Sequence, residues 1–314
     1  ENRGLEYMFI MMNAARYAVG VQGIAISERA YQKAVQYARD RVQSRPVDGS
    51  FNTAAPIIHH PDVKRMLMTM RATTEGCRAM ASVAAAAFDA AHHHPDAAVR
   101  QQNATFYEFM VPLVKGYSTE MSLEVTSLGV QVHGGMGFIE ETGAAQYYRD
   151  AKILTIYEGT TAIQANDLVG RKTARDGGAT AKAIAAQIAV TEAELAAGSA
   201  QAQAVAKRLK AAREAFIEVV DFIAANTRSN PNAAFAGSVP YLMLAGNLMA
   251  GWQLGRALLV AESLSAQGQD AAFMQSKITT ARFYADHILS RAPGIRDAIV
   301  EGAEAVTALT ADAF

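Results

Sequence analysis

Cysteine, proline and tryptophan are scarce in this sequence of 314 residues, which has one cysteine, eight prolines and one tryptophan. A single cysteine, Cys77, excludes an internal disulfide and a thiolate-rich metal site, which fits a reducing compartment and favours a cytoplasmic location. Few prolines together with 51% hydrophobic residues exclude a disordered or fibrous chain. The composition predicts a folded protein with a sizeable core.

The sequence also lacks an excess of charge and a long uninterrupted apolar run. Its net charge is −1, so it has no surplus of basic side chains to neutralise a nucleic acid, which is disfavoured as the main partner. The longest uncharged stretch, residues 229–255, contains Pro231, Pro240 and Asn247, and we expect a buried helix there rather than a membrane span. The chain starts at Glu1 without a secretory leader, so we expect it to begin midway in a longer protein.

Strand-like alternation of apolar and polar residues is rare, whereas alanine is abundant, so the sequence predicts an all-α fold. Long helices are expected over residues 5–43, 61–92 and 95–128, with a kink at Pro112 in the third. The segment 45–61 contains Pro46 and Gly49 and is expected to be a loop. Three long helices with short or moderate connections predict an antiparallel bundle.

A second helical module is expected to follow residues 172–180, which are small, polar and contain glycine. Apolar residues recur at three- and four-residue steps from Val205 to Ile223, as in an amphipathic helix. Two further helices, around residues 241–267 and 270–291, and a final helix after Pro293 are expected to complete a second bundle. We identify no pattern in this module that carries chemistry.

Glycines and polar residues are densest between residues 129 and 170. Gly134, Gly135 and Gly137 allow backbone N–H groups to approach a ligand phosphate, although such segments are most often only turns. Glu158 follows an apolar stretch and precedes Thr160 and Thr161, either of which can cap a helix. A carboxylate on an apolar rim is desolvated and suited to act as a general base; a solvated loop glutamate is the alternative.

Two segments together resemble the C-terminal signature of the acyl-CoA dehydrogenase family. Residues 131–138 read Gln-Val-His-Gly-Gly-Met-Gly-Phe, and residues 149–160 contain Arg-Asp-Ala-Lys and then Ile-Tyr-Glu-Gly-Thr, in the order and spacing of that family. The residues that resemble the first helix of its C-terminal bundle are Arg16, Gly20, Gly23, Ala25, Tyr37, Ala38 and Arg41. The resemblance implies a four-helix-type bundle in residues 1–172, followed in residues 173–314 by the helical extension of the larger family members.

The resemblance also implies an activity. Glu158 is expected to remove the α-proton of an acyl-CoA thioester while FAD takes the β-hydride, which gives a trans-2-enoyl-CoA. The backbone N–H of Glu158 and a ribityl hydroxyl of FAD are expected to meet the enolate oxygen. The substrate is expected to be 3-methylmercaptopropionyl-CoA or a fatty acyl-CoA. The residues implied in substrate binding are Asn13, Arg16, Tyr157 and Gly159, and those implied in FAD binding are Arg41, Gln131, Val132, His133, Gly134, Gly135, Thr160 and Ala162.

The resemblance further implies a homodimer or higher homo-oligomer, because Arg41 is expected to reach the FAD of a partner subunit. An electron-transfer flavoprotein or another acceptor is expected to take the electrons. Because the family's N-terminal and middle domains are missing from the sequence, we expect the chain alone to be inactive. No metal site is expected, since His92, His93 and His94 cannot all face one ion from a helix. An acyl-CoA oxidase and a non-catalytic helical relative that binds or protects nucleic acid are the alternatives.

Overall fold

Helices form every long element of the computed structural model, which describes residues 2–314. The α-helices are α1 (Gly4–Asp40), α2 (Pro61–His93), α3 (Ala97–Pro112), α4 (Ser118–His133), α5 (Gly135–Phe138), α6 (Ala144–Leu154), α7 (Thr161–Asp167), α8 (Ala179–Ala196), α9 (Ala200–Asn226), α10 (Pro231–Ala236), α11 (Ser238–Ala266), α12 (Ala271–His287), α13 (Ala292–Val300) and α14 (Ala303–Val306). Two π-helical turns, η2 (Leu113–Tyr117) and η4 (Leu168–Thr173), and five 3₁₀ turns connect them: η1 (Ile57–His59), η3 (Glu140–Thr142), η5 (Ala174–Asp176), η6 (Leu289–Arg291) and η7 (Ala311–Ala313). The prediction of an all-α chain is confirmed.

The long helices begin and end near the positions that the sequence predicts. Helix α2 has Pro61 in its first turn, where a missing N–H costs nothing, and Asp62 beside its positive end. Helix α3 begins after Asp96, whose carboxylate accepts a hydrogen bond from the N–H of Ala98 at 2.7 Å. The third predicted helix differs from expectation, because the π-helical turn η2 follows Pro112 and α4 then continues to His133. Pro112 has no N–H to donate, which removes one bond from the regular ladder at this point.

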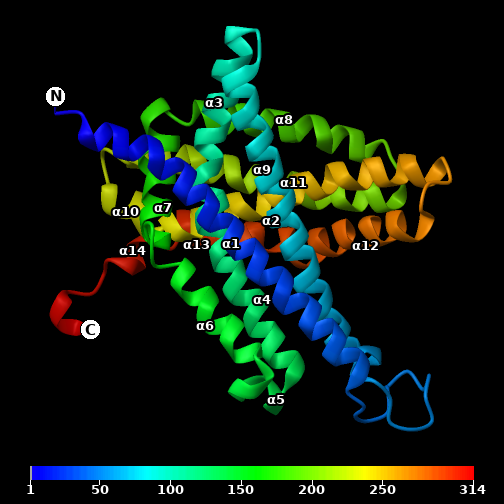
Figure 1. Ribbon diagram of the computed structural model, residues 1–314. Coiled ribbons are helices and arrows are strands. Elements are labelled where there is room, and N and C mark those ends of the chain that lie inside the picture. The colour runs from blue at the N-terminus through cyan, green and yellow to red at the C-terminus, as the bar shows by residue number, and fades with distance from the viewer. Residues whose placement is uncertain (1) are drawn as a thin grey trace.

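The helices after α7 cross those before it. In Figure 1, α8, α9, α11 and α12 run across the group formed by α1, α2 and α4. Helix α2 packs against α1, α3 and α4 on one side and against α11 and α12 on the other. The largest hydrophobic core cluster accordingly contains side chains from α2, α3 and η2 as well as from α8, α9, α11 and α12. The two predicted parts of the chain therefore share a core, and their division at residue 172 stays a prediction.

Helix α11 contains most of the uncharged stretch and is buried along much of its length, as expected from the sequence. Its small residues let neighbouring elements approach closely. A β-carbon placed on Gly246 would lie 2.2 Å from Cγ of Tyr117, which belongs to η2. Across the residues 2–314, no helix has the length and hydrophobicity that a membrane span requires.

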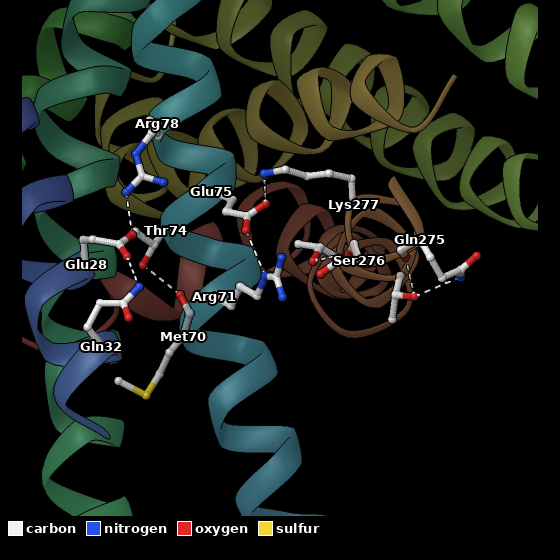
Figure 2. A network of polar contacts seen from close by, with 12 residues as sticks. Glu28, Gln32, Met70, Arg71, Thr74, Glu75, Arg78, Gln275, Ser276 and Lys277 are labelled. Carbon is white, nitrogen blue, oxygen red and sulfur yellow. Dashed lines mark hydrogen bonds and ion pairs between the residues drawn. The ribbon is translucent and has the colours of Figure 1, made fainter. Parts of the chain in front are cut away.

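A polar network joins α1, α2 and α12 at the surface beside this core. Figure 2 shows Arg71 and Lys277 reaching toward Glu75, with Nε of Arg71 at 2.9 Å and Nζ of Lys277 at 2.8 Å from its carboxylate oxygens. On the other side of α2, Arg78 donates a hydrogen bond to Glu28 of α1 at 2.5 Å. Arg71 pairs with Glu75 within α2, whereas Lys277 reaches it from α12. Glu75 is largely buried, so its pair with Lys277 stabilises the docking of α12 on α2 more than an exposed pair would.

The contact between Gly246 and Tyr117 predicts a strong effect of one added methyl group. The Tyr117 ring is fully buried and its hydroxyl is hydrogen-bonded to Asn247, so it has no room to move. Gly246→Ala should lower the free energy of unfolding by about 2 to 3 kcal/mol, measured by urea denaturation.

Gly294→Ala in α13 is the matched control, because a β-carbon there meets no atom within 4 Å. This substitution should leave stability unchanged or raise it by up to about 1 kcal/mol. Equal unfolding midpoints for the two variants would contradict the close contact between α11 and η2.

Candidate functional site

Glu158 lies in a six-residue loop, residues 155–160, between α6, which ends at Leu154, and α7, which begins at Thr161. Glu158 has a φ of +54° and Gly159 a φ of +90°, so two successive residues in the left-handed region turn the chain sharply. A left-handed backbone at a glutamate costs on the order of 1 kcal/mol and persists only where its surroundings hold it. Thr160 then caps α7, since its Oγ1 accepts a hydrogen bond from the N–H of Ile163 at 3.3 Å.

The Glu158 side chain is exposed, so of the two alternatives left open by the sequence the structure has the solvated loop glutamate and not the desolvated carboxylate. The apolar neighbours on which the desolvated alternative rested do not cover the carboxylate, because Ile153 and Ile156 are themselves 52% and 49% exposed. The loop therefore presents its carboxylate on an open apolar rim. The backbone N–H of Glu158 donates no hydrogen bond to any described residue.

A buried lysine lies beneath this loop. Nζ of Lys115, from the turn η2, donates hydrogen bonds to the carbonyl oxygen of Leu154 at 2.8 Å and to that of Gly159 at 2.6 Å. Lys115 is fully buried, and this burial lowers the pKa of its ammonium group to about 8. The sequence motifs did not indicate a role for Lys115. The available signal was a single lysine inside the apolar run from Val111 to Val114 and Gly116.

Helix α1 borders the other side of the loop. Arg16 is buried, and its Nη1 lies 3.5 Å from Oδ2 of Asp167 in α7, while its Nε has no hydrogen-bond partner among the described residues. The hydroxyl of Tyr157 donates a hydrogen bond to Gln22. Asn13 is half-buried on the same face of α1 as Arg16, three residues earlier. The four residues implied in substrate binding thus lie along α1 and the Glu158 loop.

A separate cavity of about 580 Å³ opens at the far end of α1. It brings together six of the residues implied in FAD binding, which the sequence separates by about ninety positions: Arg41, Gln131, Val132, His133, Gly134 and Gly135. The remaining lining, for which the sequence predicted no role in FAD binding, is Tyr37, Gln43, Ser44, Ile57, His60, Val63, Met66 and Met136. Thr160 and Ala162 do not line this cavity, since they lie beside Glu158 at the start of α7.

One wall of the cavity is held by contacts of a buried histidine, whereas the rim is exposed. The His133 ring stacks on Tyr37 with centroids 4.4 Å apart, and its Nδ1 lies 2.7 Å from the carbonyl oxygen of Gly129. Burial lowers the pKa of His133, so its imidazole is neutral near pH 7. At the rim, Arg41 is exposed and has no carboxylate partner within residues 2–314, and Gly134 ends α4 with a φ of +58°.

The three consecutive histidines make local contacts only. Nδ1 of His92 lies 2.8 Å from the carbonyl oxygen of Phe88, and Nδ1 of His94 accepts a hydrogen bond from the N–H of Asp96. No group of three metal-ligating side chains occurs in the described part of the chain.

Comparisons with known proteins match this chain to two family models. The family model "Acyl-CoA dehydrogenase, C-terminal domain" matches residues 2–174, and "Acetyl-CoA dehydrogenase C-terminal like" matches residues 180–310. The chain is 62% identical over 289 residues to a 3-methylmercaptopropionyl-CoA dehydrogenase of Ruegeria pomeroyi, which covers 92% of this chain and 49% of that protein. It is 34% identical to a broad-specificity linear acyl-CoA dehydrogenase of Mycobacterium tuberculosis, over 95% of this chain and 51% of that protein.

The fold also matches a solved structure. An acyl-CoA dehydrogenase from Bacillus anthracis, complexed with FAD, superposes with a TM-score of 0.76 at 19% identity, over 96% of this chain and 51% of that chain. The chain spans about half the length of the curated relatives it matches.

The depressed pKa of Lys115 predicts a specific dependence of stability on pH. Its folded pKa of about 8 lies below the value of about 10.4 expected in the unfolded chain, so the unfolded chain binds more protons between these values. The free energy of unfolding should therefore gain about 1 to 2 kcal/mol from this group as the pH rises from about 7.5 to about 9.5.

Urea denaturation at both pH values measures the increment, and Lys115→Met should lack it. Lys152→Met removes an exposed lysine from α6 and should retain it. The assignment is wrong if the Lys115→Met and wild-type chains gain the same stability over this range.

Proposed function

Because the chain belongs to the acyl-CoA dehydrogenase family, we propose that it supplies the C-terminal helical part of an FAD-dependent enzyme that converts an acyl-CoA thioester into a trans-2-enoyl-CoA. The observation that carries this proposal is the loop of Glu158, which holds a carboxylate and an unused backbone N–H on an open rim. The 62% identity to the Ruegeria enzyme favours 3-methylmercaptopropionyl-CoA as substrate, ahead of a fatty acyl-CoA.

In this proposal Glu158 removes the α-proton of the thioester. An α-proton beside a thioester carbonyl is only weakly acidic, so the base must be held in place and the developing enolate oxygen must be met by a hydrogen-bond donor. The N–H of Glu158 is available as one such donor, because no described residue accepts from it. Asn13, Arg16, Tyr157 and Gly159 would hold the acyl-CoA along α1 and the loop.

The large cavity at the end of α1 has the donor set that FAD needs. The exposed guanidinium of Arg41 suits a pyrophosphate, since a planar fork of N–H donors matches phosphate oxygens. Gly134 and Gly135 leave open space beside the backbone, and the apolar side chains of Val132 and Met66 suit an aromatic ring system. When bound, FAD accepts the hydride from the β-carbon. The residues proposed to hold it are Arg41, Gln131, Val132, His133, Gly134, Gly135, Thr160 and Ala162.

We also propose a homodimer or a larger homo-oligomer in the cytoplasm. Arg16 lies in α1 and Arg41 directly follows its last residue, 25 residues and roughly 38 Å further along the helix, which is longer than one FAD molecule. The cavity at Arg41 and the loop at Glu158 would therefore contribute to different FAD molecules, each shared with a second subunit. An electron-transfer flavoprotein or another acceptor would take the electrons from the reduced flavin.

An acyl-CoA oxidase is the second candidate, since the same base and cofactor serve both reactions. The curated relatives named above are dehydrogenases, which favours the first candidate. Stoichiometric release of hydrogen peroxide during turnover by the intact protein would instead identify an oxidase.

Replacing the carboxylate of Glu158 by an amide should abolish the reaction. In the intact protein that carries this chain, Glu158→Gln should lower kcat at least about 1000-fold, because an amide cannot accept the α-proton. The affinity for acyl-CoA should stay within about threefold. Dye reduction with a panel of acyl-CoA thioesters, including 3-methylmercaptopropionyl-CoA, gives kcat, and α-proton exchange into heavy water reports the first step alone.

Glu141→Gln is the matched control, because Glu141 is an exposed glutamate outside the Glu158 loop and should tolerate the change. Retention of α-proton exchange in Glu158→Gln would rule out the proposed base.

Reversing the charge of Arg41 should weaken FAD binding. Producing this variant together with a second inactive variant should restore part of the activity, because hybrid dimers contain one intact site. Arg41→Glu should lower the flavin content at least about tenfold, because a carboxylate would face the pyrophosphate. When Arg41→Glu and Glu158→Gln subunits are produced together, half of the dimers are hybrids, and each hybrid has one intact shared site. Flavin absorbance and dye reduction should then show about a quarter of wild-type turnover.

Arg45→Glu serves as the control, since Arg45 is exposed and does not line the cavity. No recovered activity in the mixed preparation, with both subunits present in the purified dimers, would mean that each site is built from one chain.

A further inference from the structure

The position of Lys115 follows from the irregular turn that carries it. After Pro112, the helix widens into the π-helical turn η2, and every residue of this turn is buried. Single π-helical turns inside longer helices occur often at functional sites, because they redirect a side chain that a regular helix would place elsewhere. Here the redirected side chain is that of Lys115, which extends from η2 to the loop between α6 and α7.

The ammonium group of Lys115 joins the two ends of the loop that carries Glu158. Leu154 is the last residue of α6, and its carbonyl group belongs to the final turn, whose oxygens have no partner within the helix. A cation at this end of a helix also interacts favourably with the helix dipole. Gly159 directly follows Glu158, so one ammonium fixes the backbone before and after the proposed base.

The other polar contacts of this backbone are longer or lie outside it. Nε2 of Gln164 lies 3.5 Å from the carbonyl oxygen of Glu158 and 3.4 Å from that of Gly159, at the limit of a hydrogen bond. The N–H of Thr161 donates to the carbonyl oxygen of Thr155 at 3.1 Å, which closes the base of the loop but does not touch Glu158. The bond from Lys115 to Gly159, at 2.6 Å, is therefore the shortest contact that holds the left-handed pair of residues.

Three neighbouring charged side chains interact with the ammonium group of Lys115. Glu120 in α4 and Glu158 itself attract it, whereas Arg16 in α1 repels it. Glu120 in turn accepts a hydrogen bond from the hydroxyl of Thr161. The buried ammonium group of Lys115 thus contacts the loop backbone and interacts electrostatically with Arg16 of α1.

We propose that Lys115 is a positioning residue for the base: by holding the carbonyl groups of Leu154 and Gly159, it sets the left-handed turn that aims the carboxylate and the N–H of Glu158 at the thioester. This inference rests on the proposed function. It assigns Lys115 no contact with substrate. A loop released from the ammonium group would sample other backbone angles at Glu158, and a displacement of about 1 Å between base and α-carbon lowers a rate about 100-fold.

The test uses Lys115→Met in the intact FAD-loaded protein, because methionine keeps the length of the side chain and removes its charge and its donors. The kcat should fall about 100-fold, the KM for acyl-CoA should stay within about threefold, and flavin content should match wild type. Proton removal becomes rate-limiting, so the kinetic isotope effect of α-deuterated substrate on kcat should increase. Lys152→Met, which removes an exposed lysine of α6, should change none of these values.

A purely structural role gives a different result. The variant would then lose stability or flavin, while kcat per bound flavin and the isotope effect would stay at wild-type values, and the proposal would be overturned. Should Lys115→Met not fold, Lys115→Gln replaces it, since its amide can still donate to one carbonyl; an intermediate kcat supports the proposal. Failure of both variants to fold overturns it, because Lys115 would then be required for the fold itself.

The outcome of Glu158→Gln separates this inference from the function on which it rests. If Glu158→Gln keeps α-proton exchange, the proposed function fails whatever Lys115 does. If Glu158→Gln abolishes exchange while Lys115→Met keeps wild-type kcat and isotope effect, only the role of Lys115 fails.

Discussion

The π-helical turn from Leu113 to Tyr117 is the constraint on which the rest of the structure depends. One of its residues, Lys115, holds both ends of the Glu158 loop, and another, Tyr117, is buried against Gly246 and hydrogen-bonded to Asn247 in α11. The same five residues therefore connect the proposed site to the helices of the extension. Because the turn is fully buried, neither contact can shift without disturbing the other.

This connection explains how the helices of residues 173–314 can affect the proposed site without lining it. The described helices after α7 contribute no residue to the Glu158 loop or to the cavity at Arg41. They pack instead against α2 and η2, and the cluster of Glu75, Arg71 and Lys277 adds a polar contact at the edge of this packing (Figure 2). The shared core fixes the backbone from which Lys115 extends.

Prediction from the sequence was correct for features that depend on residues close together in the chain. The start of α2 at Pro61 and the cap at Thr160 depend on which backbone groups lack a helical partner, and the neighbouring residue types indicate this. It left the environment of Glu158 open, and the structure decides it, because the apolar neighbours Ile153 and Ile156 are exposed rather than packed over the carboxylate. It also missed Lys115, since a lysine in an apolar run does not reveal which carbonyl groups it will meet 39 and 44 residues later.

The sequence by itself determined the all-α class, the approximate helices and, through two spaced motifs, the family. These follow from side-chain periodicity, capping and residue identity, all of which act over a few positions. Only the tertiary structure decided that Arg41 and Gln131 share a cavity, that Glu158 is exposed and that Lys115 lies beneath it. Those features depend on how distant helices pack, and a buried charge gains its partners only when that packing excludes water.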